Sequence, residues 1–220
     1  MVPHTLGPVD VLSRIIHGGY TTLSVASLAT LFGVLPGLLI GTIAGYWGGI
    51  VDSIALIALN SMAALPGLII ALVLLTTFPQ SFLTLAFAAG LAQIPLYGHF
   101  TRTVIRGLRH RDYIVAAEAL GSRRTRILYR HIGYVAAPQL LSYAGVIFSY
   151  TMITSTSLSF LGLNGDPAAP EWGAMLAEGR TVLKQMPWMS LGPAVLITGS
   201  IFVVHTLSTR LMSPLPARHL

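Results

Sequence analysis

The sequence contains no cysteine and very little charge. With no Cys among 220 residues, a disulfide scaffold, a thiol nucleophile and a thiolate metal site are all excluded. Charged residues make up 9% of the chain, whereas soluble domains carry about 25%. Hydrophobic residues make up 54%. A soluble chain of this size could not keep its surface hydrated with so few charges, so the composition indicates a membrane protein.

The charges are absent from four long stretches, at 15–51, 53–101, 131–165 and 185–209. A helix needs about 20 mainly apolar residues to cross a bilayer. The stretch at 53–101 has room for two such helices, with a turn at Phe78-Pro79-Gln80-Ser81 between them. We therefore expect five spans, at about 21–45, 53–77, 82–101, 135–158 and 190–209.

The predicted fold class is an all-α integral membrane protein with about five transmembrane helices. Strands of a membrane barrel alternate apolar and polar residues, and the run at 68–75 does not alternate. A buried soluble helix is the other alternative, and a charge-free stretch as long as 53–101 argues against it.

The basic residues are concentrated in one loop, and this predicts the orientation. Of the 13 Lys and Arg residues, eight lie between Arg102 and Arg130. With five spans, this loop and the C-terminus share one side, which the excess of positive charge places in the cytoplasm. The N-terminal segment 1–20 is then external, although it has no signal-peptide pattern. We expect either that a first helix is missing from the sequence or that the chain is a five-span protein.

The loop at 102–134 has an ordered plan of helix, Gly-Ser turn and helix. Asp112 and Ser122 are expected to cap the two short helices, and Gly121 is expected to end the first. A loop that only sets topology needs no such plan, so we favour a docking site for another protein. Asp52, at the turn after the first span, is expected to cap the span that follows.

The stretch at 113–132 resembles the "EAA" loop of binding-protein-dependent ABC importers, with Val115 where the family has Glu. Gly-Tyr-Trp-Gly-Gly at 45–49, Ser-Leu-Ser-Phe-Leu-Gly-Leu at 157–163 and Trp-Gly-Ala-Met-Leu at 172–176 resemble the second (C-type) permease of the dipeptide/oligopeptide/nickel group. The resemblance implies a type-1 ABC transmembrane domain over 21–220. It also implies a six-helix permease fold lacking its first helix, with a coupling loop at 102–134 and an external loop at 159–189.

The resemblance implies the partners as well. These are ABC ATPase subunits, a second permease subunit, an extracytoplasmic substrate-binding protein and membrane lipid, in a bacterial or archaeal plasma membrane. The substrate is implied to be a peptide, nickel or a related small solute. The implied ATPase-docking surface consists of Ala116, Ala117, Glu118, Ala119, Leu120, Gly121, Arg123, Arg124 and Arg126. Arg123, Arg124 and Arg126 could instead contact anionic lipid headgroups.

Polar residues elsewhere are weaker candidates. Asn60, Gln93 and His99 could line a translocation path, because polar groups in spans are functional candidates; the alternative is hydrogen bonding within the bundle. In the external loop, Trp172, Glu178 and Arg180 could contact the binding protein, or they could simply face solvent.

Several function classes lack their motifs. There is no Gly-x-x-x-x-Gly-Lys-Ser/Thr loop, no His-Glu-x-x-His and no carboxylate inside a predicted span, so we expect neither ATP binding nor enzymatic activity nor a cofactor. The basic residues crowd one loop and do not cover a folded soluble face, so no nucleic acid is expected. A secondary transporter or channel without an ATPase, or a degenerate inactive permease, remains the alternative.

Overall fold

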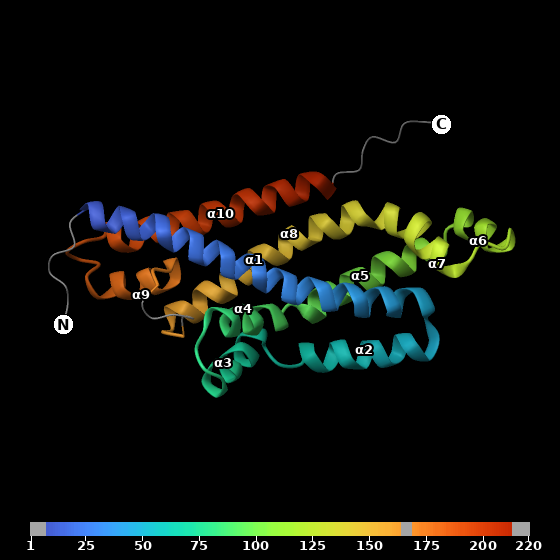
Figure 1. Ribbon diagram of the computed structural model, residues 1–220, viewed down its shortest axis with the longest axis horizontal. Helices are drawn as coiled ribbons and strands as arrows, with labels where there is room; N and C mark the ends of the chain where they lie inside the picture. Colours follow the sequence, from blue (N-terminus) through green and yellow to red (C-terminus); the bar gives the residue numbers. More distant parts are fainter. Residues whose placement is uncertain (1–7, 164–168, 213–220) are drawn as a thin grey trace.

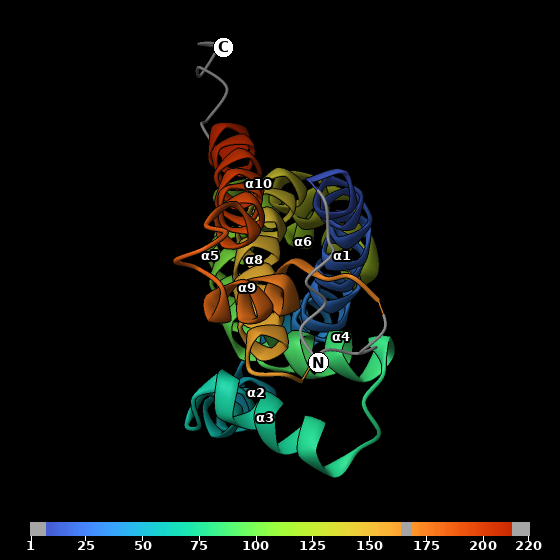
Figure 2. The same cartoon turned by 90° about the vertical axis from the view of Figure 1, so that its left-hand side faces the viewer.

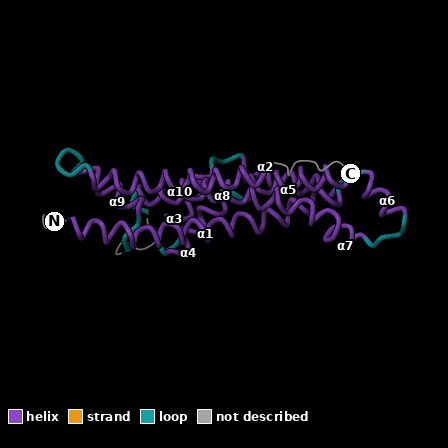
Figure 3. The backbone as a smooth tube through the Cα atoms, turned by 90° about the horizontal axis from the view of Figure 1, so that it is seen from above, coloured by secondary structure: helices purple, strands orange, loops and turns teal. Residues whose placement is uncertain are grey.

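The computed structural model describes residues 8–163 and 169–212, and every regular element in this part of the chain is a helix (Figure 1). The long helices run along the long axis of the molecule (Figure 3). The elements are α1 (Pro8–Trp47), α2 (Gly49–Ala63), α3 (Gly67–Thr77), α4 (Phe82–Leu91), α5 (Ile94–Arg109), α6 (Asp112–Ala119), α7 (Arg124–Arg126), the π-helix η1 (Ile127–Gly133), α8 (Tyr134–Phe160), α9 (Trp172–Thr181) and α10 (Trp188–Met212).

Three helical stretches are long and apolar enough to cross a membrane. They are Leu12–Trp47, Arg124–Phe160 and Trp188–Arg210, and they contain the predicted spans at 21–45, 135–158 and 190–209. The boundary expected at residue 20 has no structural counterpart, because α1 continues back to Pro8. Residues 1–7 of the predicted N-terminal segment lie outside the described residues.

The two predicted spans within 53–101 are both interrupted. The first is the pair α2 and α3, bent by 74° at Ala64–Pro66, where proline removes a backbone donor and disfavours helix in the preceding residue. Counted as one span, this pair raises the number to four. The stretch predicted at 82–101 is divided at Ala92 and Gln93 into α4 and α5. Together these elements form an all-helical membrane fold.

Helix α1 packs closely against α4 and α5 along a seam of glycines. A Cβ atom at Gly41 would lie 2.5 Å from the carbonyl oxygen of Gly98, and one at Gly45 would lie 2.7 Å from that of Arg102. The facing residues advance by four on both sides, through Gly33, Gly37, Gly41 and Gly45 on α1 and through 90, 94, 98 and 102 on the partner. The helices therefore run parallel with their backbones in contact, as small residues permit in membranes.

Three apolar clusters distribute the core along the bundle. One joins α1, α3, α4 and α8; a second lies under α6 and includes Tyr46 and Ile114; the third includes Trp172 and packs α9 against α1 and α8. The loop helices α6 and α7 thus lie at one end and α9 at the other (Figure 1). Figure 2 looks onto the α9 end.

Candidate functional site

The helix α6 is a short, well-terminated element inside the predicted docking loop. Gly121 adopts φ +78°, a conformation that glycine reaches without strain. The backbone N–H of Ser122 donates to Ala117 (3.1 Å) and that of Gly121 donates to Glu118 (2.9 Å), which is the Schellman pattern. The predicted end of the helix at Gly121 is confirmed. The predicted caps are wrong, because Arg111 and Arg123 occupy the N-cap positions and neither side chain caps.

The exposed surface of α6 is mainly apolar, with the acidic residues Asp112 and Glu118, and basic residues follow it in the chain. Only Ile114 of this helix is buried, in the cluster with Tyr46. Leu120 is 86% exposed and Val115 is also exposed. Of the nine residues predicted to form the docking surface, all are exposed except Ala117, which is half-buried. A groove of about 490 Å³ is lined by Leu120, Gly121, Ser122, Arg123, Thr125 and Arg126.

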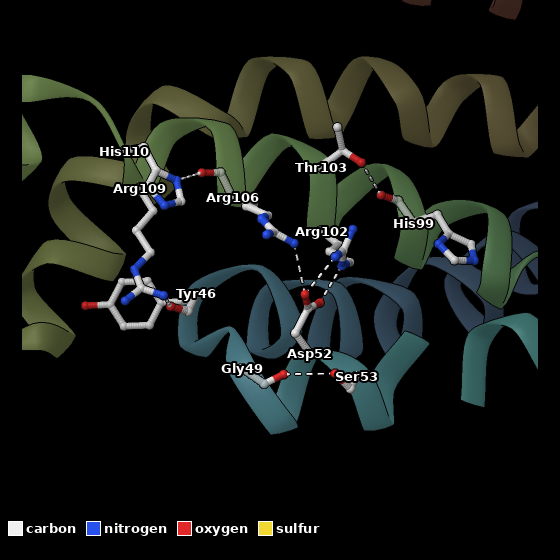
Figure 4. A network of polar contacts seen from close by, with 10 residues as sticks. All are labelled: Tyr46, Gly49, Asp52, Ser53, His99, Arg102, Thr103, Arg106, Arg109 and His110. Carbon is white, nitrogen blue, oxygen red and sulfur yellow. Dashed lines mark hydrogen bonds and ion pairs between the residues drawn. The ribbon is translucent and has the colours of Figure 1, made fainter. Parts of the chain in front are cut away.

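The loop is tied to the end of α1 through Tyr46. The buried Tyr46 hydroxyl donates to the carbonyl oxygen of Arg124 at 2.9 Å. The guanidinium of Arg109 donates a hydrogen bond to the carbonyl oxygen of Tyr46 (Figure 4). The same guanidinium lies 5.7 Å from the centre of the Tyr46 ring. Tyr46 of α1 is thus hydrogen-bonded to α7 through its hydroxyl group and to α5 through its carbonyl oxygen.

Next to Tyr46, Asp52 joins α2 to α5. Its nearly buried carboxylate accepts hydrogen bonds from Arg102 Nε, from Arg102 Nη2 at 2.7 Å and from Arg106 Nη1 at 3.0 Å (Figure 4). The expected capping role is wrong: Gly48 is the N-cap of α2, and Asp52 points sideways onto α5. The signal was present in the sequence, because Asp52 and Arg102 are the two charges that delimit the stretch 53–101.

The loop continues into α8 through a π-helix. Residues Ile127–Gly133 have the wider turn, and the helical segment is continuous from Arg124 to Phe160. Ile127 and Ile132 of this segment are buried beside Tyr46. Such wider turns occur often at functional sites. Here the turn joins the exposed loop to a membrane-spanning helix.

The three candidate path residues have different environments. Asn60 is exposed on α2. Gln93 is buried at the junction of α4 and α5, and its Nε2 lies 3.5 Å from Thr154 Oγ1 on α8. His99 is half-buried on α5, on the same helix as Arg102 (Figure 4). Gln93 thus contacts α8 inside the bundle, whereas Asn60 faces away from it.

At the opposite end, Trp172 fastens α9 to α1. Its indole Nε1 donates to Ile15 O at 2.8 Å, its backbone N–H donates to Thr22 Oγ1 at 3.0 Å, and its side chain is buried. Because the indole ring is buried, it holds α9 in place and does not form part of the exposed surface. Glu178 and Arg180, the other two candidates for binding-protein contact, are exposed.

The exposed pair on α9 is also held in place. Glu178 forms an ion pair with Arg14 at 2.9 Å, and the Arg180 guanidinium lies 5.8 Å from the centre of the Phe160 ring. Among the described residues, no group of three or more His, Asp or Glu side chains is arranged to hold a metal ion.

Comparisons with known proteins agree with this geometry. The family described as "Binding-protein-dependent transport system inner membrane component" matches residues 37–215. A dipeptide transport system permease protein of Alkalihalophilus pseudofirmus is 29% identical over 84% of this chain and 60% of its own length. A glutathione transport system permease protein of Pectobacterium atrosepticum is 29% identical over 94% of this chain and 68% of its own length.

The chain thus spans about 60–70% of the length of the curated relatives it matches. A solved structure described as an amino acid ABC transporter with histidines superposes with a TM-score of 0.61 over 97% of both chains. At 21% identity this likeness concerns the fold alone.

Proposed function

Because the chain belongs to the family of binding-protein-dependent transport system inner membrane components, we propose that it is one permease subunit of an ATP-driven importer. The observation that carries the proposal is the exposed helix α6, with its mainly apolar surface and the basic residues that follow it, anchored below by Ile114. A secondary transporter or channel has no use for such a surface. ATP hydrolysis is then the work of partner subunits.

The proposed mechanism transmits movement from the loop to the spans. Partner ATPases dock on the loop surface defined above and shift it as a rigid body. Tyr46 and Arg109 couple this shift to α1 and α5, while the continuous segment from Arg124 to Phe160 couples it to α8. The central path opens alternately to the two sides as these spans move.

The proposed orientation places the loop 102–134 and the C-terminus in the cytoplasm, and α9 outside. The concentration of basic residues in that loop supports it. The protein then lies in the inner membrane of a bacterium or archaeon. A binding protein meets the surface around Glu178 and Arg180, and the ATPase subunits meet the opposite end.

The second permease subunit completes the path. Asn60 is exposed on a membrane-spanning helix, and a polar side chain facing lipid is unfavourable. Asn60 therefore faces the partner permease or the water-filled path. The proposed substrate is a small peptide. Relatives named for dipeptide and glutathione transport support a peptide over nickel.

The decisive test is co-purification with an ATPase. The chain is expressed with its neighbouring genes and isolated in mild detergent, together with Leu120→Arg and the control Gly107→Arg. Leu120 is 86% exposed, and Gly107 has open space around its Cβ position on α5, so neither change disturbs packing.

We expect an ATPase subunit to accompany the wild type and Gly107→Arg, and to be lost from Leu120→Arg. Retention by Leu120→Arg would refute the docking surface. If no ATPase accompanies the wild type, the importer proposal fails and the degenerate permease becomes the better reading. A complex that forms but shows no ATP-dependent peptide uptake in proteoliposomes would leave the docking intact and refute the substrate.

A further inference from the structure

The α9 end contains a cavity that the proposed mechanism does not use. Its volume is about 270 Å³, roughly nine times the volume of a water molecule in the liquid. It lies between α1 and α4 and is bordered by the residues that lead into α9, at the end shown in Figure 2. Its lining includes Tyr20, Ser24, Val25, Phe82, Leu85 and Glu171. The lining is thus mainly apolar, with hydroxyl-bearing residues and Glu171 as its one acidic residue.

Glu171 is an acid fixed inside the protein. It is 2% exposed, and its Oε1 accepts a hydrogen bond from the buried Ser159 hydroxyl at 2.7 Å. The next residue is Trp172, which two hydrogen bonds hold on α1. Burial raises the pKa of Glu171 above its usual value, and the Ser159 hydrogen bond opposes this in part. A buried carboxylate of this kind is stabilised by any cation that reaches it.

Two of the described cations at this end are engaged elsewhere. Arg14 pairs with Glu178, and the Arg180 guanidinium lies over the Phe160 ring. Neither they nor Lys184 contribute to the pKa shift of Glu171, which comes from burial and the Ser159 hydroxyl. The segment 164–168, Asn-Gly-Asp-Pro-Ala, contains no basic side chain. Among the described residues, no basic side chain pairs with Glu171, so a cationic ligand that enters the cavity would supply a charge that this part of the chain does not.

The lining identifies the kind of cation. Calcium takes six to eight oxygen ligands, and Zn²⁺ takes nitrogen, sulfur or several carboxylates, whereas this cavity offers one carboxylate. Two aromatic residues, Tyr20 and Phe82, share the wall with Val25 and Leu85. Aromatic faces attract organic ammonium groups, and apolar walls accommodate the carbon atoms attached to them.

We propose that this cavity binds the ammonium group of a small organic cation, with the Glu171 carboxylate as counter-charge and Tyr20 and Phe82 as the aromatic wall. If the ligand is a transported peptide, its amino terminus enters the cavity from the outer face of the membrane. This part of the inference rests on the proposed function. The contact would then select for a free amino terminus before the substrate reaches the central path.

Trp172 provides a direct readout that needs no ATPase. Trp47→Phe and Trp188→Phe, both at exposed positions, leave Trp172 as the sole tryptophan, directly beside Glu171. The purified chain is titrated with glycinamide, which carries an ammonium group, and with N-acetylglycinamide, which does not. We expect a saturable change in Trp172 emission with glycinamide alone. Equal responses to both probes, or no response to either, would overturn the proposal.

Two variants test the roles of the Glu171 carboxylate and the Tyr20 ring separately. Glu171→Gln keeps the size of the side chain and a hydrogen-bonding partner for Ser159, so the fold is retained while the charge is lost, and glycinamide binding should disappear. Tyr20→Ala changes an exposed ring and should weaken glycinamide binding about two- to fivefold. Unchanged glycinamide binding in Glu171→Gln would overturn the site.

The test is separable from that of the importer. Glycinamide binding without ATPase co-purification would support the cavity and refute the importer. ATPase co-purification and uptake of N-acetylated and free peptides at equal rates would support the importer and refute the selective role of Glu171.

Discussion

The carboxylate of Asp52 offers a matched experiment, because it binds two arginines that differ in burial. The side chains of Asp52 and Arg102 are 10% and 17% exposed, whereas that of Arg106 is 54% exposed. Arg102 donates through Nε and Nη2, and Arg106 donates through Nη1 alone. Arg102→Met and Arg106→Met therefore remove the same chemical group from two different environments.

We expect Arg102→Met to lower the free energy of unfolding by about 2 kcal/mol, the range for hydrogen bonds to charged groups with little solvent around them. Arg106→Met should cost less than about 1 kcal/mol, because solvent screens its interaction. Asp52→Asn should cost about 3 kcal/mol, because it leaves the guanidinium of Arg102 nearly buried without a counter-charge.

The assay is unfolding in mixed micelles of mild detergent and dodecyl sulfate, followed by circular dichroism. Arg130→Met, at an exposed position outside this network, controls for loss of positive charge alone. The double variant Asp52→Asn/Arg102→Met should be more stable than the sum of the single costs predicts, because both partners are then gone. Equal costs for Arg102→Met and Arg106→Met would refute the reasoning from burial.

Three further predictions use the same unfolding assay. Gly41→Ala should cost about 1–3 kcal/mol, because its Cβ would overlap the facing backbone, whereas Gly107→Ala, in open space, should be neutral or slightly stabilising; a harmless Gly41→Ala would contradict the seam. Tyr46→Phe should cost about 1 kcal/mol and speed amide hydrogen exchange in the loop 102–134, and unchanged exchange would show that the tyrosine does not hold the loop. The pKa of Glu171 is raised in the folded state, so its stabilising contribution is complete below the ordinary pKa and is lost as pH rises through the native value. Wild type should therefore lose stability relative to Glu171→Gln over this pH range, and parallel pH profiles would contradict the burial of the charge.

Hydropathy predicted the positions of the helices well, but it predicted the interruptions within them poorly. The charge-free stretch 53–101 covers most of α2, all of α3 and α4 and the first half of α5, and the one mark of the division at Gln93 is Pro95 in the first turn of α5. Proline is ambiguous in such a sequence: Pro36 and Pro138 lie inside continuous helices, whereas Pro66 precedes one. Neighbouring helices decide which proline interrupts a helix, and a single sequence does not contain that information.

The sequence predicted the local structure of the loop 102–134 better than it predicted the contacts between residues far apart in the chain. The end of α6 follows from Gly121 and the residues beside it. The pairing of Asp52 with Arg102 joins residues far apart in the chain, and the burial of Trp172 depends on α1. The glycine spacing at 33, 37, 41 and 45 was readable as a repeated small-residue motif, and it would have predicted the seam.

Within α1, different residues determine insertion into the membrane and packing against the neighbouring helix. The large apolar residues of α1, such as Leu31, Leu35 and Leu39, are exposed on the bundle and make the helix soluble in lipid. The glycines contribute little to that solubility, but they determine which helix α1 meets once it is there. A change from glycine to alanine or valine would leave insertion into the bilayer intact and weaken the packing of α1 against α5. Entry into the membrane and recognition between helices are thus encoded by different residues, so each can fail without the other.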